Sequence, residues 1–241
     1  MTTQAKYKRV LLKLTGEIFG GEGKRGLDFP SFGRISRYIH EMKQKLEIEI
    51  AIVVGGGNLF RAREIAEYPV DRSTADYIGM LGTVMNALAL QEELERFGET
   101  TRVMSSVNIQ SVCEPFVKRK AVRHLEKGRI VILAGGTGNP FFTTDSAAAL
   151  KAAELNCNIL LKASNTDGVY DSDPIKNKNA KLYRELSYQE ALEKGLTVMD
   201  NTAFALCQNA KIPIVVFNVE NLENIEKIIA GEEIGTIVTN I

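Results

Sequence analysis

The sequence predicts an α/β protein with a mostly parallel central sheet covered by helices on both faces, a three-layer αβα sandwich. Three observations support this prediction. Apolar strands alternate with amphipathic helical segments along almost the whole chain, and most of the strands are continuously apolar, which is typical of a buried parallel sheet. The chain has 241 residues, 44% of them hydrophobic, which suits one domain over residues 1–241 with a substantial core.

Seven segments are predicted to be strands because apolar and β-branched residues run together between turn residues. They are residues 10–14, 48–54, 101–105, 129–134, 158–162, 212–218 and 235–239. In parallel sheets, ligands bind beyond the carboxyl ends of the strands. The loops that follow these segments are therefore the places to look for a site.

Helices are predicted between the strands from apolar residues at three- and four-residue spacing. Ser31 is the expected N-cap of the first helix. The longest helix is expected at about 74–97, with Leu81, Met85 and Leu88 on one face. Further helices are expected around residues 115–126, in the alanine-rich segment that ends near 154, and at 187–194, 199–209 and 222–229.

A polar segment rich in Asp, Asn and Lys fills residues 163–186. It is long for a mere connection in a compact domain. We expect a surface binding loop or a small hairpin there.

Composition and charge narrow the function classes. Thirty basic and thirty acidic side chains cancel, so no overall field draws the chain to nucleic acid or an anionic membrane, and nucleic-acid binding is not expected. The apolar runs are too short to span a bilayer, and residues 1–10 lack the apolar stretch of a signal peptide. Three widely spaced cysteines argue against a disulfide framework, so we expect a cytoplasmic protein.

Several predicted strands end in residues suited to binding phosphate. Lys13 and Thr15 close the first strand, three glycines and Arg61 follow the second, and Lys162 closes the fifth. Glycines let a ligand approach the backbone, and a guanidinium group can bind two phosphate oxygens at once. Taken singly, a strand-end lysine is usually a solvated terminus and a triple glycine a tight turn. Together at one edge of a sheet, they indicate an anion site.

Residues 135–154, GGTGNPFFTTDSAAALKAAE, follow the fourth strand. A strand–loop–helix junction of this kind directs backbone N–H groups and a helix N-terminus at one place, which suits an anion. The hydroxyl and aromatic side chains could hold a polar ring or a sugar beside that anion. The alternative is a structural loop that only caps its helix.

Cations gathered from several loops are what phosphoryl transfer requires. The transferred group spreads its charge over three oxygens, so catalysis depends on positioned cations and magnesium rather than on a covalent nucleophile. Asp145, near the start of the alanine-rich helix, could orient the two lysines or bind magnesium.

Two common nucleotide-binding motifs are not supported. Residues 21–26 match G-x-G-x-x-G literally, but residues 27–30 intervene before the next helix, whereas a dinucleotide fingerprint runs directly into its helix. The chain has no G-x-x-x-x-G-K-[ST] segment, so a kinase here would not be of the P-loop class.

Over nearly its whole length, the chain resembles the bacterial uridylate (UMP) kinases of the amino-acid kinase superfamily. The resemblance rests on KLTGE, GGGNLFR, ADYIGMLGTVMNALAL, GTGNPFFTTDSAA, KASNTDGVYDSDP and VMD, in the same order and at matching distances. Superfamily relatives that act on carbamate, glutamate or aspartate share the lysines and glycine turns, but not GTGNPFFTTD together with the Asp76 helix. The resemblance implies an amino-acid kinase-like fold and Mg²⁺-dependent transfer of phosphate from ATP to UMP in pyrimidine nucleotide biosynthesis.

Carried over position by position, the resemblance implies two neighbouring nucleotide sites. The ATP phosphates would be bound by Lys13, Leu14, Thr15, Gly16, Gly57 and Arg61, and the adenosine half by Ser164, Asn165, Tyr170 and Asp173. UMP would be bound by Gly56, Asp76, Thr137, Gly138, Asn139, Pro140, Phe141, Phe142, Thr143 and Thr144. Lys13 and Lys162 would be the transition-state cations, with Asp145 organising them or the magnesium that ATP carries. Asp200 also matches a family position, with its role left open.

The resemblance further implies a homohexamer that UTP inhibits and that, in many members, GTP activates. Thr15 stands where serine is commoner and keeps the hydroxyl, and Ala62 stands where glycine is usual and could reshape that turn. The possible GTP segment is one residue longer than in the family, which leaves GTP control open; it comprises Gly21, Glu22, Gly23, Lys24, Arg25 and Gly26.

Two other hypotheses remain. One is a kinase of the same superfamily that acts on a small carboxylate or carbamate. The other is a nucleotide-sensing regulator that only binds its ligand and touches DNA. The neutral net charge and the presence of Lys13, Lys162 and Asp145 count against a regulator, because a sensor needs no transition-state cations. A screen of acceptor substrates separates the three hypotheses.

Overall fold

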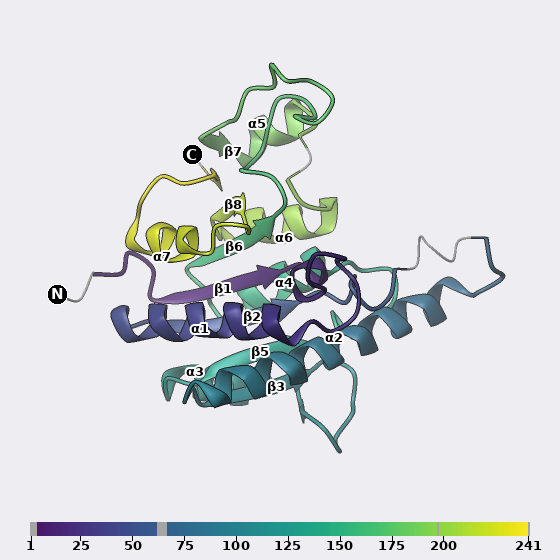
Figure 1. Ribbon diagram of the computed structural model, residues 1–241. Helices are drawn as coiled ribbons and strands as arrows, with labels where there is room; N and C mark the ends of the chain where they lie inside the picture. Colours follow the sequence, from purple (N-terminus) through teal and green to yellow (C-terminus); the bar gives the residue numbers. More distant parts are fainter. Residues whose placement is uncertain (1–3, 62–66, 197, 241) are drawn as a thin grey trace.

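The structure is a computed structural model that describes residues 4–61, 67–196 and 198–240. In these residues the strands form one nine-stranded sheet in the order β4-β3-β5-β2-β1-β6-β8-β9-β7. Helices cover both faces of the sheet (Figure 1), which confirms the predicted three-layer α/β sandwich. The expectation of a single domain over residues 1–241 stays a prediction.

All seven predicted strands are present, with ends within two residues of the expected ones. The sheet consists of β1 (Arg9–Leu14), β2 (Glu49–Val54), β3 (Thr101–Ser105), β4 (Glu114–Pro115), β5 (Ile130–Ala134), β6 (Ile159–Ser164), β7 (Glu185–Ser187), β8 (Ile214–Asn218) and β9 (Thr236–Thr239). Every pairing is parallel except that of β8 with β9, as expected for a mostly parallel sheet. The sequence does not predict β4 and β7, because two or three residues leave no apolar run.

The helices divide between two core layers. They are η1 (Gly16–Phe19, a 3₁₀ helix), α1 (Phe29–Lys45), α2 (Arg72–Arg96), α3 (Lys118–Glu126), α4 (Thr144–Glu154), α5 (Tyr188–Glu193), α6 (Asn201–Ala210) and α7 (Glu223–Ala230). Apolar side chains of α1, α2 and α7 pack with one face of the sheet, and those of α3, α4, α5 and α6 pack with the other.

Two predicted helix starts are wrong. The first helix begins at Phe29 with Asp28 as its N-cap, whose carboxylate accepts a hydrogen bond of 3.0 Å from the Ser31 N–H. Aspartate caps as well as serine does, and Pro30 fits the first turn, where no N–H partner is needed. The helix expected around residues 115–126 begins only at Lys118, after the short strand β4.

Of the three residues predicted to share one face of the longest helix, only Leu88 packs against the core. Leu81 and Met85 of α2 are 48% and 49% exposed, and Tyr77 and Ile78 beside them are also exposed. The buried side of α2 instead carries Met80, Val84, Leu90 and Leu94 together with small and polar residues such as Asn86. Because α2 is apolar on more than one side, spacing alone does not reveal which side packs on the sheet.

The polar segment 163–186 is partly a small hairpin, one of the two expected forms. An isolated antiparallel bridge joins Tyr170 to Leu182, and the Tyr183 N–H donates to the Val169 carbonyl. The hairpin follows β6 in the chain and precedes β7.

Four strands that carry predicted site residues are neighbours in the sheet, in the order β5-β2-β1-β6. All three of these pairings are parallel, so the four carboxyl ends lie at one edge. The sequence prediction of a shared sheet edge is therefore confirmed.

Candidate active site

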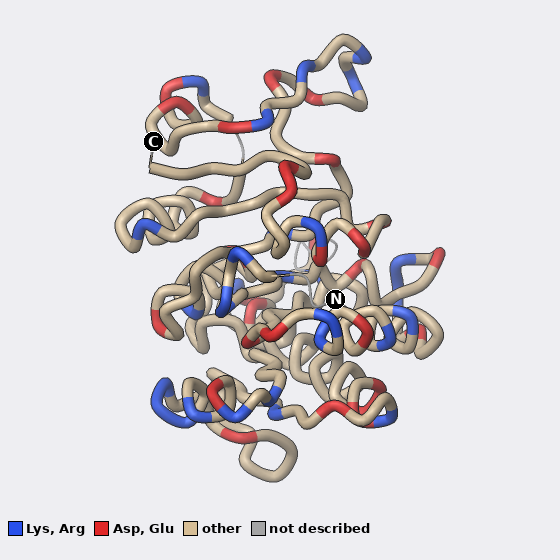
Figure 2. Tube along the Cα trace, turned by 90° about the vertical axis from the view of Figure 1, so that its left-hand side faces the viewer, with Lys and Arg blue, Asp and Glu red and all other residues tan. Residues whose placement is uncertain are grey.

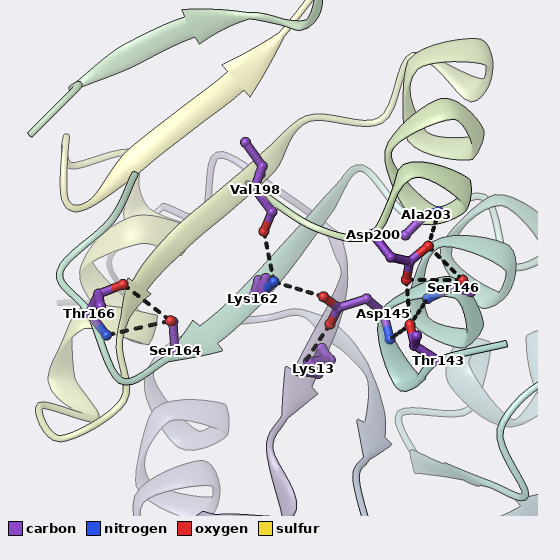
Figure 3. A network of polar contacts seen from close by, with 10 residues as sticks. All are labelled: Lys13, Thr143, Asp145, Ser146, Lys162, Ser164, Thr166, Val198, Asp200 and Ala203. Carbon is purple, nitrogen blue, oxygen red and sulfur yellow. Dashed lines mark hydrogen bonds and ion pairs between the residues drawn. The ribbon is translucent and has the colours of Figure 1, made fainter. Parts of the chain in front are cut away.

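Two lysines and one carboxylate lie at the centre of this sheet edge (Figure 3). The Nζ atom of Lys13 is 3.0 Å from Oδ1 of Asp145, and that of Lys162 is 2.7 Å from Oδ2. Lys162 Nζ also donates to the Val198 carbonyl at 2.7 Å. The three charged side chains are only 12–16% exposed. The charged side chains from β1, β6 and α4 therefore face one another, and all three are largely buried.

The charges of this group are set by burial and mutual attraction. Burial alone would raise the pKa of Asp145, but the positive charges of Lys13 and Lys162 outweigh it and hold the pKa below its ordinary value. Burial lowers the pKa of Lys162, and its attraction to Asp145 opposes that change. With Asp145 ionised between two ammonium groups, the trio carries an excess of one positive charge. A preorganised positive charge of this kind suits a phosphoryl group in transfer.

The local sequence explains why Asp145 points into this group. Thr143 is the N-cap of α4, and its Oγ1 accepts hydrogen bonds from the N–H groups of Asp145 and Ser146 at 3.1 and 3.2 Å. An acidic residue in the first turn is also favoured by the helix dipole. The capping role considered for residues 135–154 is therefore real, and the same cap presents Asp145 to the lysines.

Asp200, whose role the sequence leaves open, links the starts of two helices (Figure 3). It is the N-cap of α6 and accepts a hydrogen bond of 2.9 Å from the Ala203 N–H. Its carboxylate also accepts from Ser146 Oγ at 2.9 Å and from Thr143 Oγ1. Asp200 therefore fixes the first turn of α4, which carries Asp145, against the first turn of α6.

The exits of β1 and β2 are in direct backbone contact. A Cβ atom added to Gly16 would lie 2.5 Å from the Gly57 nitrogen, so only glycine allows this approach. Arg61, four residues beyond Gly57, donates from Nε to the Gly57 carbonyl at 2.7 Å and from Nη2 to Glu17 Oε1 at 2.6 Å. The structure thus brings together the first two strand exits, with Lys13 to Gly16 on one and Gly57 and Arg61 on the other, the residues that the resemblance assigns to ATP phosphates.

A buried pair of amides, which the sequence does not predict, supports these exits. Asn58 and Asn86 donate to each other at 3.0 and 2.7 Å. Asn58 also donates to the Gly26 carbonyl and Asn86 to the Gly55 carbonyl. The available signal was an asparagine within the apolar run of α2, because a buried amide needs hydrogen-bond partners.

The residues predicted to bind UMP also lie together. Asp76 on α2 accepts a hydrogen bond of 2.8 Å from the Phe141 N–H in the loop between β5 and α4. Arg72 donates to both oxygens of Asp76 at 3.0 Å, and its guanidinium lies 5.8 Å from the centre of the Phe141 ring. The aromatic side chains of Phe141 and Phe142 are exposed. One end of α2 and the loop at 137–144 therefore form a single surface.

Gly56 joins the same surface through α2. A Cβ atom at Gly56 would lie 2.7 Å from the Gly79 carbonyl oxygen and 3.1 Å from the Thr83 nitrogen. Thr83 Oγ1 in turn accepts from the Gly135 N–H at 2.8 Å. The exits of β2 and β5 are therefore both packed against the backbone of α2.

The four residues expected around adenosine are not all brought together. Tyr170 and Asp173 line one cavity of about 370 Å³. Asn165 instead lines a second cavity, of about 580 Å³, and donates to Glu17 Oε2 at 3.1 Å. Ser164 Oγ lies 3.3 Å from the Thr166 hydroxyl (Figure 3). Asn165 thus contacts the phosphate-side residues more directly than it contacts the Tyr170 cavity.

The segment 21–26 lies beside the second cavity, which Gly21, Glu22 and Lys24 help to line. Lys24 Nζ is 3.9 Å from Glu17 Oε2. The segment therefore adjoins the exit of β1. Ala62, which departs from the family pattern, lies outside the described residues.

The donor set at the site suits a metal ion that arrives with phosphate. Within residues 4–61, 67–196 and 198–240, no group of three or more His, Cys, Asp or Glu side chains could hold a metal ion. Asp145 provides a carboxylate at the centre of the site, beside two cations. Magnesium commonly uses one or two protein carboxylates together with substrate phosphates, and this arrangement fits that pattern.

The surface has no overall charge bias. Figure 2 shows basic and acidic residues interspersed along the chain trace, in keeping with a formal net charge of +0. In the part of the chain that the structure describes, no helix is both long and apolar enough to cross a membrane. The three cysteines, Cys113, Cys157 and Cys207, are free thiols.

Comparisons with known proteins agree with the geometry. The model of the amino acid kinase family matches residues 8–218. UMP kinase from Bacillus anthracis is 38% identical with a TM-score of 0.92, and the match covers 97% of this chain and 96% of that chain. UMP kinase from Ureaplasma parvum is 35% identical with a TM-score of 0.89, over 97% and 99% of the two chains. Uridylate kinase from Archaeoglobus fulgidus is 28% identical with a TM-score of 0.72, over 95% and 99%.

Proposed function

Since the chain belongs to the amino acid kinase family, we propose that it is a UMP kinase, which transfers the γ-phosphoryl group of ATP to UMP. Identities of 35% and 38% over 97% of the chain support UMP as the acceptor. The observation that carries the chemistry is the trio of Lys13, Asp145 and Lys162, placed where the phosphate-side loops meet the loop at 137–144.

The trio explains how the chain would promote the transfer. A phosphate oxygen of UMP forms a bond to the γ-phosphorus, and the bond from that phosphorus to the β–γ bridging oxygen breaks, which leaves ADP and UDP. The protein supplies no covalent nucleophile. Lys13 and Lys162 would stabilise the charge on the equatorial oxygens, and Asp145 would hold both ammonium groups in place.

We assign the two nucleotides to the two sides of the trio. The γ-phosphate end of ATP would lie against the exits of β1 and β2, from Lys13 to Gly16 and at Gly57 and Arg61, and its adenosine toward Ser164, Asn165, Tyr170 and Asp173. UMP would lie against Gly56, Asp76 and the loop at 137–144. The contact of Gly16 with Gly57 and the hydrogen bond from Phe141 to Asp76 support these assignments.

We propose that Mg²⁺ enters the site with ATP. When bound, it would neutralise charge on the β- and γ-phosphates. Asp145 would either bind the ion or hold the two lysines in position. Both roles require an ionised carboxylate, and the lowered pKa of Asp145 keeps it ionised.

By analogy with the family, we further propose that the chain forms a homohexamer in the cytoplasm. It would act in pyrimidine nucleotide biosynthesis, and UTP would inhibit it. The exposed apolar side chains Tyr77, Ile78, Leu81 and Met85 on α2 support self-association, because such a group seldom stays in contact with water on a monomer. GTP would act through residues 21–26, a segment one residue longer than in the family. The rate of ADP release with and without GTP measures its effect.

A coupled assay of ADP release tests the proposal. With ATP and magnesium, we expect release that depends on UMP, with little turnover of CMP or AMP. Equal rates of ADP release with and without UMP would contradict the proposal. Release with glutamate, aspartate or carbamate, and none with UMP, would establish the carboxylate or carbamate kinase instead. A DNA complex that persists at physiological salt, without turnover, would favour the regulator.

A further inference from the structure

Glu17 lies in η1, directly after β1, and contacts residues from three other loops. Its Oε1 atom accepts a hydrogen bond from Arg61 at 2.6 Å, and its Oε2 atom accepts one from Asn165 at 3.1 Å. Lys24 Nζ lies 3.9 Å from Oε2. One carboxylate therefore connects the exits of β2 and β6 and the segment 21–26 to the exit of β1.

The contact with Arg61 fixes the direction of the guanidinium group. The side chains of Glu17 and Arg61 are 23% and 19% exposed, and hydrogen bonds between opposite charges are the stronger kind. Arg61 is also anchored through Nε to the Gly57 carbonyl at 2.7 Å. These two contacts fix the plane of the guanidinium group, and the planar fork of N–H donors that such a group carries suits phosphate oxygens.

We propose that Glu17 is a positioning residue for ATP. Its carboxylate holds Arg61 on the phosphate side and Asn165 on the nucleoside side, so that the exits of β1, β2 and β6 form one preordered surface. Ordering these side chains before ATP arrives removes that entropic cost from binding. The inference rests on the proposed function, because it takes ATP as the ligand. Glu17 acts through Arg61 and Asn165, so its loss changes ATP affinity more than the rate of transfer.

The opposite role is physically possible and predicts the opposite result. A carboxylate that occupies the place of a phosphate oxygen on Arg61 would compete with ATP, and its removal would tighten binding. The contact with Asn165 favours a positioning role for Glu17. If Glu17 only competed with phosphate for Arg61, it would not need a second partner at the exit of β6.

Glu17→Gln tests the inference, because it removes the charge and keeps the shape and one acceptor oxygen. Glu220→Gln is the matched control: it alters another carboxylate at the same cavity of about 580 Å³. The measurements are the Kd of ATP with magnesium by calorimetry, and kcat and both KM values by ADP release. We expect the Kd and KM for ATP to rise roughly tenfold in Glu17→Gln, with kcat and the KM for UMP changed less than about threefold. The control should match the wild type.

A double-mutant cycle with Arg61→Ala shows whether Glu17 acts through Arg61. We expect Glu17→Gln to weaken ATP binding much less in the Arg61→Ala background than in the wild type. An unchanged or lower Kd in Glu17→Gln, or an equal loss in both backgrounds, would overturn the inference. A wild type that binds ATP but releases no UMP-dependent ADP would remove the proposed function alone, since the binding measurements on Glu17 need no turnover.

Discussion

Lys13 and Lys162 are direct cross-strand partners in the parallel pairing of β1 with β6, and each contacts a different oxygen of Asp145. Aligned residues of neighbouring strands project from the same face of a sheet. The separation of the two charges is therefore set by the sheet register, whereas Asp145 comes from the first turn of a helix. A site built this way needs little reorganisation during the reaction.

Replacing Lys13 by alanine removes one of the two cations while leaving the rest of the nucleotide surface in place. We expect kcat to fall by a factor of about 100 to 1000, as when one preorganised transition-state donor is lost. Binding of ATP should persist, because the proposed phosphate contacts of Arg61 and the glycine loops would remain. Lys8→Ala, at the opposite end of the same strand region, is the control and should keep wild-type kcat. A wild-type kcat in Lys13→Ala, measured by ADP release, would take Lys13 out of the mechanism.

Asp145→Asn should change how stability depends on pH. The pKa of Asp145 is lowered on folding, so its charge contributes stability that is present above its ordinary pKa of about 3.8 and is lost as pH falls through the lower folded-state value. We expect the free energy of unfolding of the wild type to fall more steeply below about pH 4 than that of Asp145→Asn. At neutral pH the variant should be less stable by about 3 kcal/mol, since two lysines lose their partner. Urea unfolding at several pH values provides both measurements, and parallel pH profiles would contradict the pairing.

Strands and strand-end residues were the predictable part of this protein. Continuous apolar runs give the strands, and parallel pairing places Lys13 and Lys162 at one edge, so both lysines follow from the sequence. Asp145 also follows, because a carboxylate in the first turn of a helix after a strand must lie at that edge. What these features share is a position set by backbone geometry.

The unpredicted part depends on side chains that choose among several partners. Ser31 and Asp28 are both good caps, and only the folded turn selects Asp28. The reciprocal amides of Asn58 and Asn86 come together from positions far apart in the sequence, and the contact of Asn165 with Glu17 does the same. No local pattern encodes such pairs, although a polar residue inside an apolar run signals that a partner exists.

Asp76→Asn should weaken UMP binding selectively. Asp76 is held by Arg72 and by the Phe141 N–H, which fixes its carboxylate beside the loop at 137–144. A hydrogen bond to a charged group contributes about 1.5 to 3 kcal/mol, so the KM for UMP should rise roughly 10- to 100-fold while the KM for ATP stays within about threefold. Glu92→Gln on the exposed side of the same helix is the matched control. A rise in the KM for ATP alone would place Asp76 on the wrong side of the site.

Asp200 offers a way to separate capping from charge. Asparagine caps a helix as well as aspartate does, so Asp200→Asn should keep the stability of α6, whereas Asp200→Ala should lose about 1 to 2 kcal/mol of unfolding free energy. Both variants loosen the contacts with Thr143 and Ser146, and Asp200→Ala loosens them more. We expect the KM for UMP to rise in the order wild type, asparagine, alanine, as measured by ADP release. Equal stability of the two variants in thermal unfolding would contradict the capping role.

The apolar side chains on the outer face of α2 test the proposed assembly. Leu81 and Met85 are about half exposed in the single chain, so they either face water or cover a second copy. If they lie in an interface, Leu81→Lys buries an unpaired charge there, and sedimentation velocity should show a shift from the hexamer to smaller species. Glu92→Lys introduces the same residue at an exposed polar position of α2 and should leave the assembly intact. If Leu81→Lys sediments as the wild type does, this face lies outside any interface, because a lysine at a solvated helix position changes stability by little.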